Sequence, residues 1–189
     1  MSNKGNYERE IKFAGAEHDE VRQRLTELEA ERSGSPSFED NWLFDRDGQL
    51  EADGCVLRLR VDGRGAALTF KGPAHFEGRM KLRPEHETRV DDAGAARALL
   101  EALGYKAVRR YQKMREEWQL GGVTIALDHT PLGDFAEFEG EGADTVARRC
   151  GFDLEKAERR TYLRLYDDYV RKHPDAPPEM IFANEAGSK

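Results

Sequence analysis

The stretch YEREIKF, residues 7–13, decides the fold. In a β-strand, residues two apart share one face, so Glu8, Glu10 and Lys12 lie together. The opposite face carries the tyrosine, isoleucine and phenylalanine of the stretch, with its arginine among them. One face is therefore ionic and the other mostly apolar. If the apolar face packs against the rest of the fold, the ionic face is suited to a hard cation beside a phosphate.

Charged residues at alternate positions recur in further stretches of the chain. A sheet with one solvent-exposed face shows alternating apolar and polar residues, but it does not require charges of both signs at so many positions. A closed barrel with a charged lumen does require them. The further sets are Arg58 and Arg60; Arg83, Glu85, Glu87 and Arg89; Lys113 and Arg115; and Glu137 and Glu139.

The composition indicates one folded domain, with or without a tail. The chain has 189 residues, 38% hydrophobic and 35% charged, which favours a soluble domain with a modest core over a disordered chain. No apolar run approaches the ~18 residues that span a bilayer, and the N-terminal residues lack the apolar core of an export signal. We therefore expect a cytoplasmic protein with no membrane partner, in which Cys55 and Cys150 stay reduced.

The net charge bears on the class of partner. It is −7 at neutral pH, with a pI of about 5.4. A negative chain is a poor general binder of nucleic acid, so we expect no nucleic-acid partner. A small polyanion is still compatible, because lysines and arginines need only be concentrated in one cavity.

The alternation and the turn residues predict an α+β fold, an eight-stranded antiparallel β-barrel (a tunnel) with flanking helices and a C-terminal helix. We expect one domain over residues 1–172 and a loosely ordered tail over 173–189. In the expected helix over residues 91–103, Leu99, Leu100 and Leu103 are expected to face inward. The expected strands cover 6–13, 38–44, 55–61, 66–71, 81–90, 106–119, 123–129 and 134–141, and the expected helices cover 16–32, 91–103, 144–150 and 158–172.

The charged sets resemble the CYTH family, also called triphosphate tunnel metalloenzymes, which contains class IV adenylyl cyclases, thiamine triphosphatases and inorganic triphosphatases. Glu8, Glu10 and Lys12 match the family's ExExK hallmark. Residues 71–73 and 128–137 look closest to the class IV cyclase branch. Further family elements are matched, in order, by Arg58 and Arg60, by Lys71, by Arg83, Glu85 and Glu87, by Lys113 and Arg115, and by Asp128, Glu137 and Glu139.

The resemblance implies that the barrel lumen binds a triphosphate together with Mg²⁺ or Mn²⁺. Arginine offers a planar fork for two phosphate oxygens, whereas lysine acts as a point charge. The residues expected to bind the triphosphate are Lys12, Arg58, Arg60, Lys71, Arg83, Lys113 and Arg115.

Carboxylate oxygens are the ligands that Mg²⁺ and Mn²⁺ prefer. Two readings stay open for Glu85 and Glu87, which would either ligate metal or orient arginines of the lumen. Asp128 would either ligate metal or begin a turn. The expected metal ligands are Glu8, Glu10, Glu85, Glu87, Asp128, Glu137 and Glu139.

The reaction depends on which phosphorus faces the nucleophile. A ribose 3′-hydroxyl that attacks the α-phosphorus of ATP gives cyclic AMP and pyrophosphate, as in a class IV adenylyl cyclase, and this is the leading expectation. The alternative is a triphosphatase that hydrolyses inorganic triphosphate, thiamine triphosphate or a nucleoside triphosphate. A third reading is a non-catalytic polyphosphate-binding module.

Two residues of the first strand are the expected catalytic groups. They are Glu10 and Lys12, and Lys12 would contact phosphate or tune the pKa of the nucleophile. Because family members often pair, the resemblance also allows a homodimer.

Overall fold

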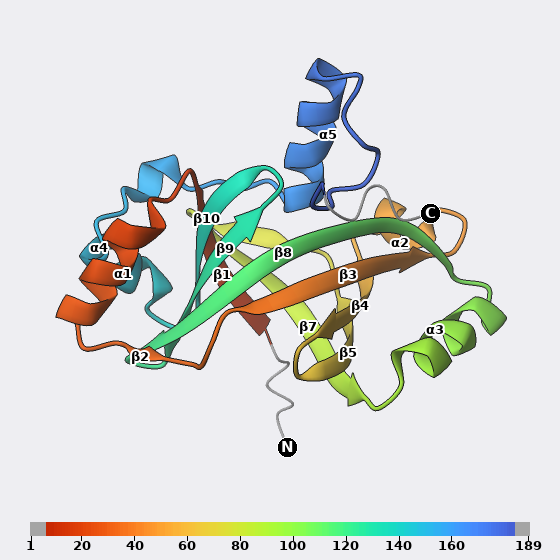
Figure 1. Cartoon of the computed structure of the whole chain (residues 1–189), viewed down its shortest axis with the longest axis horizontal. Helices are drawn as coiled ribbons and strands as arrows, with labels where there is room; N and C mark the ends of the chain where they lie inside the picture. Colours follow the sequence, from red (N-terminus) through yellow and green to blue (C-terminus); the bar gives the residue numbers. More distant parts are fainter. Residues whose placement is uncertain (1–6, 184–189) are drawn as a thin grey trace.

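The computed structural model describes residues 7–183, and the parts of the expected elements and tail at 1–6 and 184–189 lie outside them. Eight strands close into an antiparallel barrel (Figure 1), which confirms the predicted fold class. Two short strands, β2 (Glu31–Arg32) and β6 (His75–Glu77), extend the sheet beside β8 and β7. Around the barrel the strands are β1 (Tyr7–Ala14), β10 (Gly133–Glu139), β9 (Val123–Thr130), β8 (Lys106–Leu120), β3 (Ser37–Asp45), β4 (Val56–Asp62), β5 (Gly65–Lys71) and β7 (Met80–Val90).

Strand β1 closes the barrel by pairing with two neighbours. Its first half, from Tyr7 to Glu10, pairs with β7, and its second half, from Glu10 to Ala14, pairs with β10. Because successive side chains of a strand alternate, Glu8, Glu10 and Lys12 point to the inside of the closed sheet. The ionic face formed by Glu8, Glu10 and Lys12 is thus part of the wall of the lumen.

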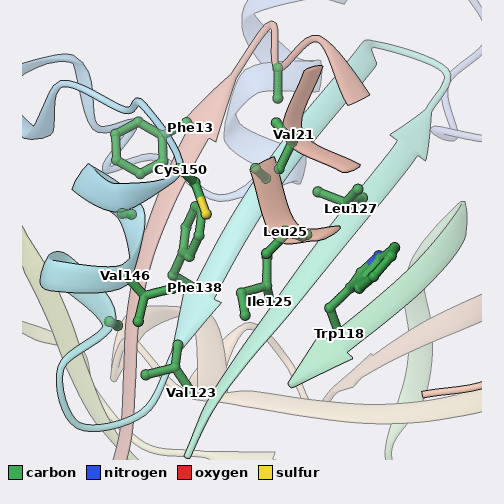
Figure 2. Close-up of a cluster of buried hydrophobic side chains, with 14 of the residues drawn as sticks. Phe13, Val21, Leu25, Trp118, Val123, Ile125, Leu127, Phe138, Val146 and Cys150 are labelled. Carbon is green, nitrogen blue, oxygen red and sulfur yellow. The ribbon is translucent and has the colours of Figure 1, made fainter. Parts of the chain in front are cut away.

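The main apolar core lies outside the barrel, between β1, β9 and β10 and two helices (Figure 2). The helices α1 (His18–Glu27) and α4 (Ala143–Arg149) cover this face. Leu25 of α1 and Ile125 of β9 are fully buried there. The outward side chains of β1 and β10 complete the cluster, so the same strands present an apolar outer face and a charged inner one.

A further helix covers another part of the barrel. Helix α3 (Ala93–Ala102) buries Leu100 against Phe44 and Leu59. The expectation that Leu99 and Leu103 also face inward is wrong, because they are 62% and 58% exposed. The contacts of the helix with the barrel include β4 and β5.

The first helix is shorter than the predicted range 16–32. It ends at Glu27, and Glu29 adopts a positive φ of 58°, which ends the helical path. Residues 31–32 then pair with Trp118 and Gln119 of β8. The final helix, expected over 158–172, is α5 (Tyr162–Lys172), and it begins late because the Thr161 side chain caps it. The short helices α2 (Gln49–Ala52) and η1 (Leu154–Lys156) were not predicted.

The segment after α5 packs against the barrel, which differs from the loose order expected of the tail. Met180 is fully buried, and its carbonyl accepts a hydrogen bond of 2.9 Å from the backbone N–H of Gln112. The Tyr166 hydroxyl donates to the carbonyl of Pro177 at 2.8 Å. Met180 and Ile181 are both buried, and they are apolar residues in a segment that is otherwise mostly polar. Across the described residues, no helix has the length and apolar character needed to cross a membrane.

Candidate functional site

The strand register places the predicted site residues on one inner surface. Residues directly opposite each other in antiparallel strands share a face. Lys12 lies opposite Glu137, and Glu10 lies opposite Glu139. The other pairs are Arg115 with Asp128, Lys113 with Glu39, Arg58 and Glu87 with Thr69, Lys71 with Glu85, and Glu8 with Arg83. Arg60 stands two residues from Arg58 on the same face of β4.

Two lysines bind carboxylates near β1. Lys71 Nζ lies 2.6 Å from Glu8 Oε1 and 2.8 Å from Glu85 Oε2. Lys81 Nζ lies 3.2 Å from Glu10 Oε2. Burial would lower the pKa of Lys81, but the charges of Glu10 and Glu8 outweigh it and raise that pKa. Sequence reasoning did not assign Lys81, although it stands two residues before the alternating set of β7.

The carboxylate of Asp128 is fully buried and holds the cations of β8. Arg115 donates to both of its oxygens, through Nε at 2.7 Å and Nη2 at 2.6 Å. Lys113 Nζ and the Tyr162 hydroxyl also donate to it, at 3.0 Å and 2.8 Å. Both oxygens are therefore engaged, an arrangement that orients cations. Asp128 does not begin a turn, since β9 continues to Thr130.

A second buried carboxylate, Glu39 of β3, lies among the same cations. Its oxygens lie 3.6 Å from Lys113 Nζ, 3.8 Å from Arg60 Nη1 and 4.0 Å from Arg115 Nε. Burial would raise the pKa of Glu39, but these charges outweigh burial and hold the pKa at about 2. Glu39 was missed because it stands next to an outward acid, Asp40, although Glu39 and Asn41 alternate with the apolar residues of β3.

Several buried polar atoms of the lumen make no hydrogen bond within the described residues. They include Nε of both Arg58 and Arg60, Oε2 of Glu8 and both amide atoms of Asn41. Buried polar groups are nearly always paired in folded proteins. These residues lie on the inner face of the barrel, so hydrogen-bonding capacity for a polar ligand remains there.

The contacts of Arg83 indicate a structural role, whereas those of Lys12 are compatible with binding a ligand. Arg83 donates Nε and Nη2 to the carbonyl of Gly72 at 2.9 and 2.6 Å, so it anchors the segment after Lys71. The expectation that Arg83 binds phosphate is therefore not favoured by its contacts. Lys12 Nζ lies 3.8 Å from both Glu10 and Glu137, and 4.6 Å from the centre of the Tyr162 ring. Lys12 is thus held loosely, with its ammonium donors directed into the lumen.

Two acids of β7 also differ in role. Glu87 accepts a hydrogen bond from the Thr69 hydroxyl at 2.8 Å and lies 3.5–3.6 Å from Arg60 and Arg58. These contacts favour the reading in which Glu87 orients arginines. Glu85 is bound by Lys71 instead.

The carboxylates near β1 include oxygens that could bind a divalent metal. Within residues 7–183, no three His, Cys, Asp or Glu side chains converge as ligands on one point. However, Glu8 keeps one buried oxygen without a partner. Burial, together with the charges of Glu8 and Glu85, raises the pKa of Glu139 to about 7. The donors on this side of the lumen are carboxylate oxygens, which a hard cation such as Mg²⁺ or Mn²⁺ prefers, although Glu8 and Glu10 are paired with Lys71 and Lys81.

A closed antiparallel barrel with buried charges of both signs on its inner wall defines a class of tunnel proteins that bind polar ligands inside. The CYTH domain family matches residues 6–165 of the chain, so this protein belongs to the CYTH family.

The chain is similar to one curated protein in sequence and to solved structures in fold. A Methanocaldococcus jannaschii protein named "Putative adenylate cyclase MJ0240" is 27% identical over 136 residues, which are 71% of this chain and 77% of that protein. A structure of a "putative adenylate cyclase" from Vibrio parahaemolyticus has a TM-score of 0.74 at 24% identity, covering 87% of this chain and 99% of the other. HpAC1 from Hippeastrum, a "putative adenylyl cyclase" described with a dominant triphosphatase activity, has a TM-score of 0.61 at 15% identity, covering 91% and 97%. At these identities the two structures show a shared fold.

Proposed function

We propose that this protein is a divalent-metal-dependent enzyme that acts on a triphosphate inside the barrel, with conversion of ATP to cyclic AMP and pyrophosphate as its reaction. The observation that carries the proposal is the cluster of buried cations on the inner wall, in which Nε of Arg58 and of Arg60 makes no hydrogen bond within the described residues and Arg60 Nε has only a 3.5 Å contact with Asp62. Buried N–H donors on fixed positive groups are suited to phosphate oxygens. Membership of the CYTH family and the adenylate cyclase names of relatives support this choice.

The cationic and the acidic residues of the lumen have different roles in this proposal. Arg58, Arg60, Lys113 and Arg115 bind and neutralise the phosphate chain, and Asp128 holds the last two in place. Phosphoryl transfer requires positioning and neutralisation of charge more than covalent chemistry from the protein. The barrel supplies both, because Asp128 on the neighbouring strand fixes Lys113 and Arg115, and Glu87 lies 3.5–3.6 Å from Arg60 and Arg58.

The acidic side of the lumen would hold the metal. Glu8, Glu10, Glu137 and Glu139 are the proposed ligands, whereas Asp128 is reassigned to orienting the cations. Mg²⁺ or Mn²⁺ held there supplies neutralisation of the phosphate oxygens and activation of the nucleophile. Lys12 stands between Glu10 and Glu137, where its ammonium contacts the reacting phosphate.

In the proposed reaction, the ribose 3′-hydroxyl gives its proton to water and its oxygen bonds to the α-phosphorus. The bond from that phosphorus to the bridging oxygen breaks, and pyrophosphate leaves. Arg58 and Arg60 would stabilise the charge that builds on the leaving group.

A second candidate reaction is hydrolysis of the triphosphate. The description of the Hippeastrum structure favours it, since that protein shares the fold and is reported with a dominant triphosphatase activity. The lumen residues serve either reaction, because the phosphate contacts are the same.

Product analysis separates the two reactions. Wild-type protein is incubated with Mg²⁺ or Mn²⁺ and, separately, with ATP, inorganic triphosphate and thiamine triphosphate. Cyclic AMP and pyrophosphate from ATP are the expected products, and they disappear in EDTA and in the Glu10→Gln variant. Glu101→Gln, an exposed change on α3, is the control and keeps full activity. Release of phosphate without cyclic AMP would establish the triphosphatase, and no product from any substrate would contradict the enzymatic role.

A further inference from the structure

Asn41, in the middle of β3, combines complete burial with an unused side-chain amide. Its exposure to water is 0%, and neither Oδ1 nor Nδ2 makes a hydrogen bond within the described residues. Thr69 and Asp128 are buried to the same extent on the inner face of the barrel. Both of these side chains are engaged, because Thr69 donates to Glu87 at 2.8 Å and Asp128 accepts from Lys113 and Arg115. Asn41 therefore stands apart from the other fully buried polar groups around it.

An asparagine at this position works against the stability of the fold. Burial of an amide without a partner destabilises a folded protein. Asparagine is also depleted in β-strands, and position 41 lies at the centre of one. An apolar residue of similar size would avoid both disadvantages. Residues that oppose their local structure in this way are expected mainly at functional sites.

The neighbours of Asn41 on the inner face include cations with unused donors. The strand register places Asn41 directly opposite Arg60 of β4 and Tyr111 of β8. Within the described residues, Nε of Arg60 and Nε of Arg58 make no hydrogen bond. The Tyr111 hydroxyl accepts a hydrogen bond of 3.3 Å from Arg58 Nη1 and is not bonded to Asn41. Long side chains reach directly opposite and diagonal positions of a neighbouring strand, so these groups can share one ligand.

The unused donors at this level of the lumen suit a phosphate group. Each phosphate oxygen accepts more than one hydrogen bond, and guanidinium groups supply both donors and charge. The amide of asparagine is a common donor to phosphate oxygens where proteins bind nucleic acids. It adds a donor without adding a positive charge, so Nδ2 does not repel the two arginines beside it.

We propose that Asn41 is a ligand-binding residue of the lumen, whose Nδ2 donates a hydrogen bond to a phosphate oxygen held by Arg58 and Arg60. In the same arrangement Oδ1 accepts from the guanidinium of Arg60, so both atoms of the amide are paired when the triphosphate is bound. This inference rests on the proposed function and deepens it, because it adds an uncharged donor to the cations that bind the phosphate chain.

Two measurements on Asn41→Leu separate a ligand contact from a structural role. Leucine has nearly the size of asparagine and no polar group. Urea unfolding should show the variant to be at least as stable as wild type, because the unpartnered amide is gone. Calorimetric binding of inorganic triphosphate in EDTA should be about tenfold weaker, which corresponds to the loss of one hydrogen bond to a charged acceptor. A structural amide would give the opposite pattern, with lower stability and unchanged affinity.

Two further variants complete the comparison. Asn41→Asp keeps the shape of the side chain but replaces the N–H donor with a negative charge, so it should bind inorganic triphosphate more weakly than Asn41→Leu does. Gln23→Met changes an exposed amide of α1 to an apolar side chain of similar size. This control should match wild type in both stability and affinity.

The outcomes that contradict the proposal differ from those that contradict the function. If wild type binds inorganic triphosphate and either Asn41 variant binds it equally well, Asn41 does not contact the ligand and the proposed function stands. An Asn41→Leu protein that is less stable than wild type would show that the amide has a structural role, and it would also overturn the proposal. If wild type binds no triphosphate, the role of Asn41 and the proposed function both fail.

Discussion

Glu39 shows how a single residue sustains the charged lumen. Its carboxylate lies within 4.0 Å of three cations at once, and its own exposure to water is 2%. Removing one partner of a buried ionic cluster is usually costly, because the others remain buried without compensation. The Glu39 carboxylate therefore stabilises the folded protein, because it offsets the repulsion among the charges of Arg60, Lys113 and Arg115.

The pKa of Glu39 gives this role a pH dependence. A folded-state pKa of about 2, below the ordinary value of 4.5, contributes stability that is fully present above pH 4.5 and is lost as the pH falls towards 2. The shift corresponds to about 3 kcal/mol. Urea unfolding should show Glu39→Gln less stable than wild type by about this amount at pH 7, and by about half of it at pH 3.

The control for this experiment is Glu101→Gln, a charge removed from the exposed surface of α3. Its difference from wild type should be small at both pH values. A Glu39→Gln protein as stable as wild type at pH 7, or a difference that does not shrink at low pH, would contradict the role assigned to Glu39.

At the scale of elements, the segment after α5 behaves as part of the barrel wall. Met180 makes a bridge with Tyr111 of β8, and its side chain is fully buried. The same segment positions α5, whose Tyr162 reaches the lumen and donates to Asp128. The order of residues 173–183 therefore affects the site as well as the core.

Replacement of Met180 by alanine tests this account. The change should destabilise the protein by about 2–5 kcal/mol, as expected for removal of a fully buried side chain. Urea unfolding monitored by circular dichroism measures it, with Asp175→Ala, an exposed change in the same segment, as the control. Equal stability of the two variants would show that the segment is not packed as described.

Comparison of the predicted and observed elements shows what the sequence encodes locally. The barrel strands were predictable because their inner and outer faces differ chemically, as in the alternation of Arg58 and Arg60 with leucines. The end of α1 was not predictable, because residues 31–32 pair with β8, a strand that is distant in sequence. The role of Lys81 follows only from the strand register, which places it opposite Glu10.

At the scale of the whole molecule, closure of the barrel is what creates the site. Charges that would be solvated on an open sheet are enclosed, so cations such as Arg115 are fixed by carboxylates and some donors stay unused. In such an interior an anion gains more from each contact than it would in water. The apolar core is on the outside, against α1 and α4 (Figure 1), so the lumen is free to remain polar.

Calorimetric binding of inorganic triphosphate tests the central claim most directly, since the ligand carries only the phosphates. Wild-type protein is compared with Arg58→Gln, which removes a lumen cation, and with Arg97→Gln, which removes an exposed arginine of α3. We expect binding to wild type and Arg97→Gln with equal affinity, and a loss of about 10- to 100-fold in Arg58→Gln. Absence of binding to wild type, or equal binding by all three proteins, would contradict a triphosphate site in the barrel.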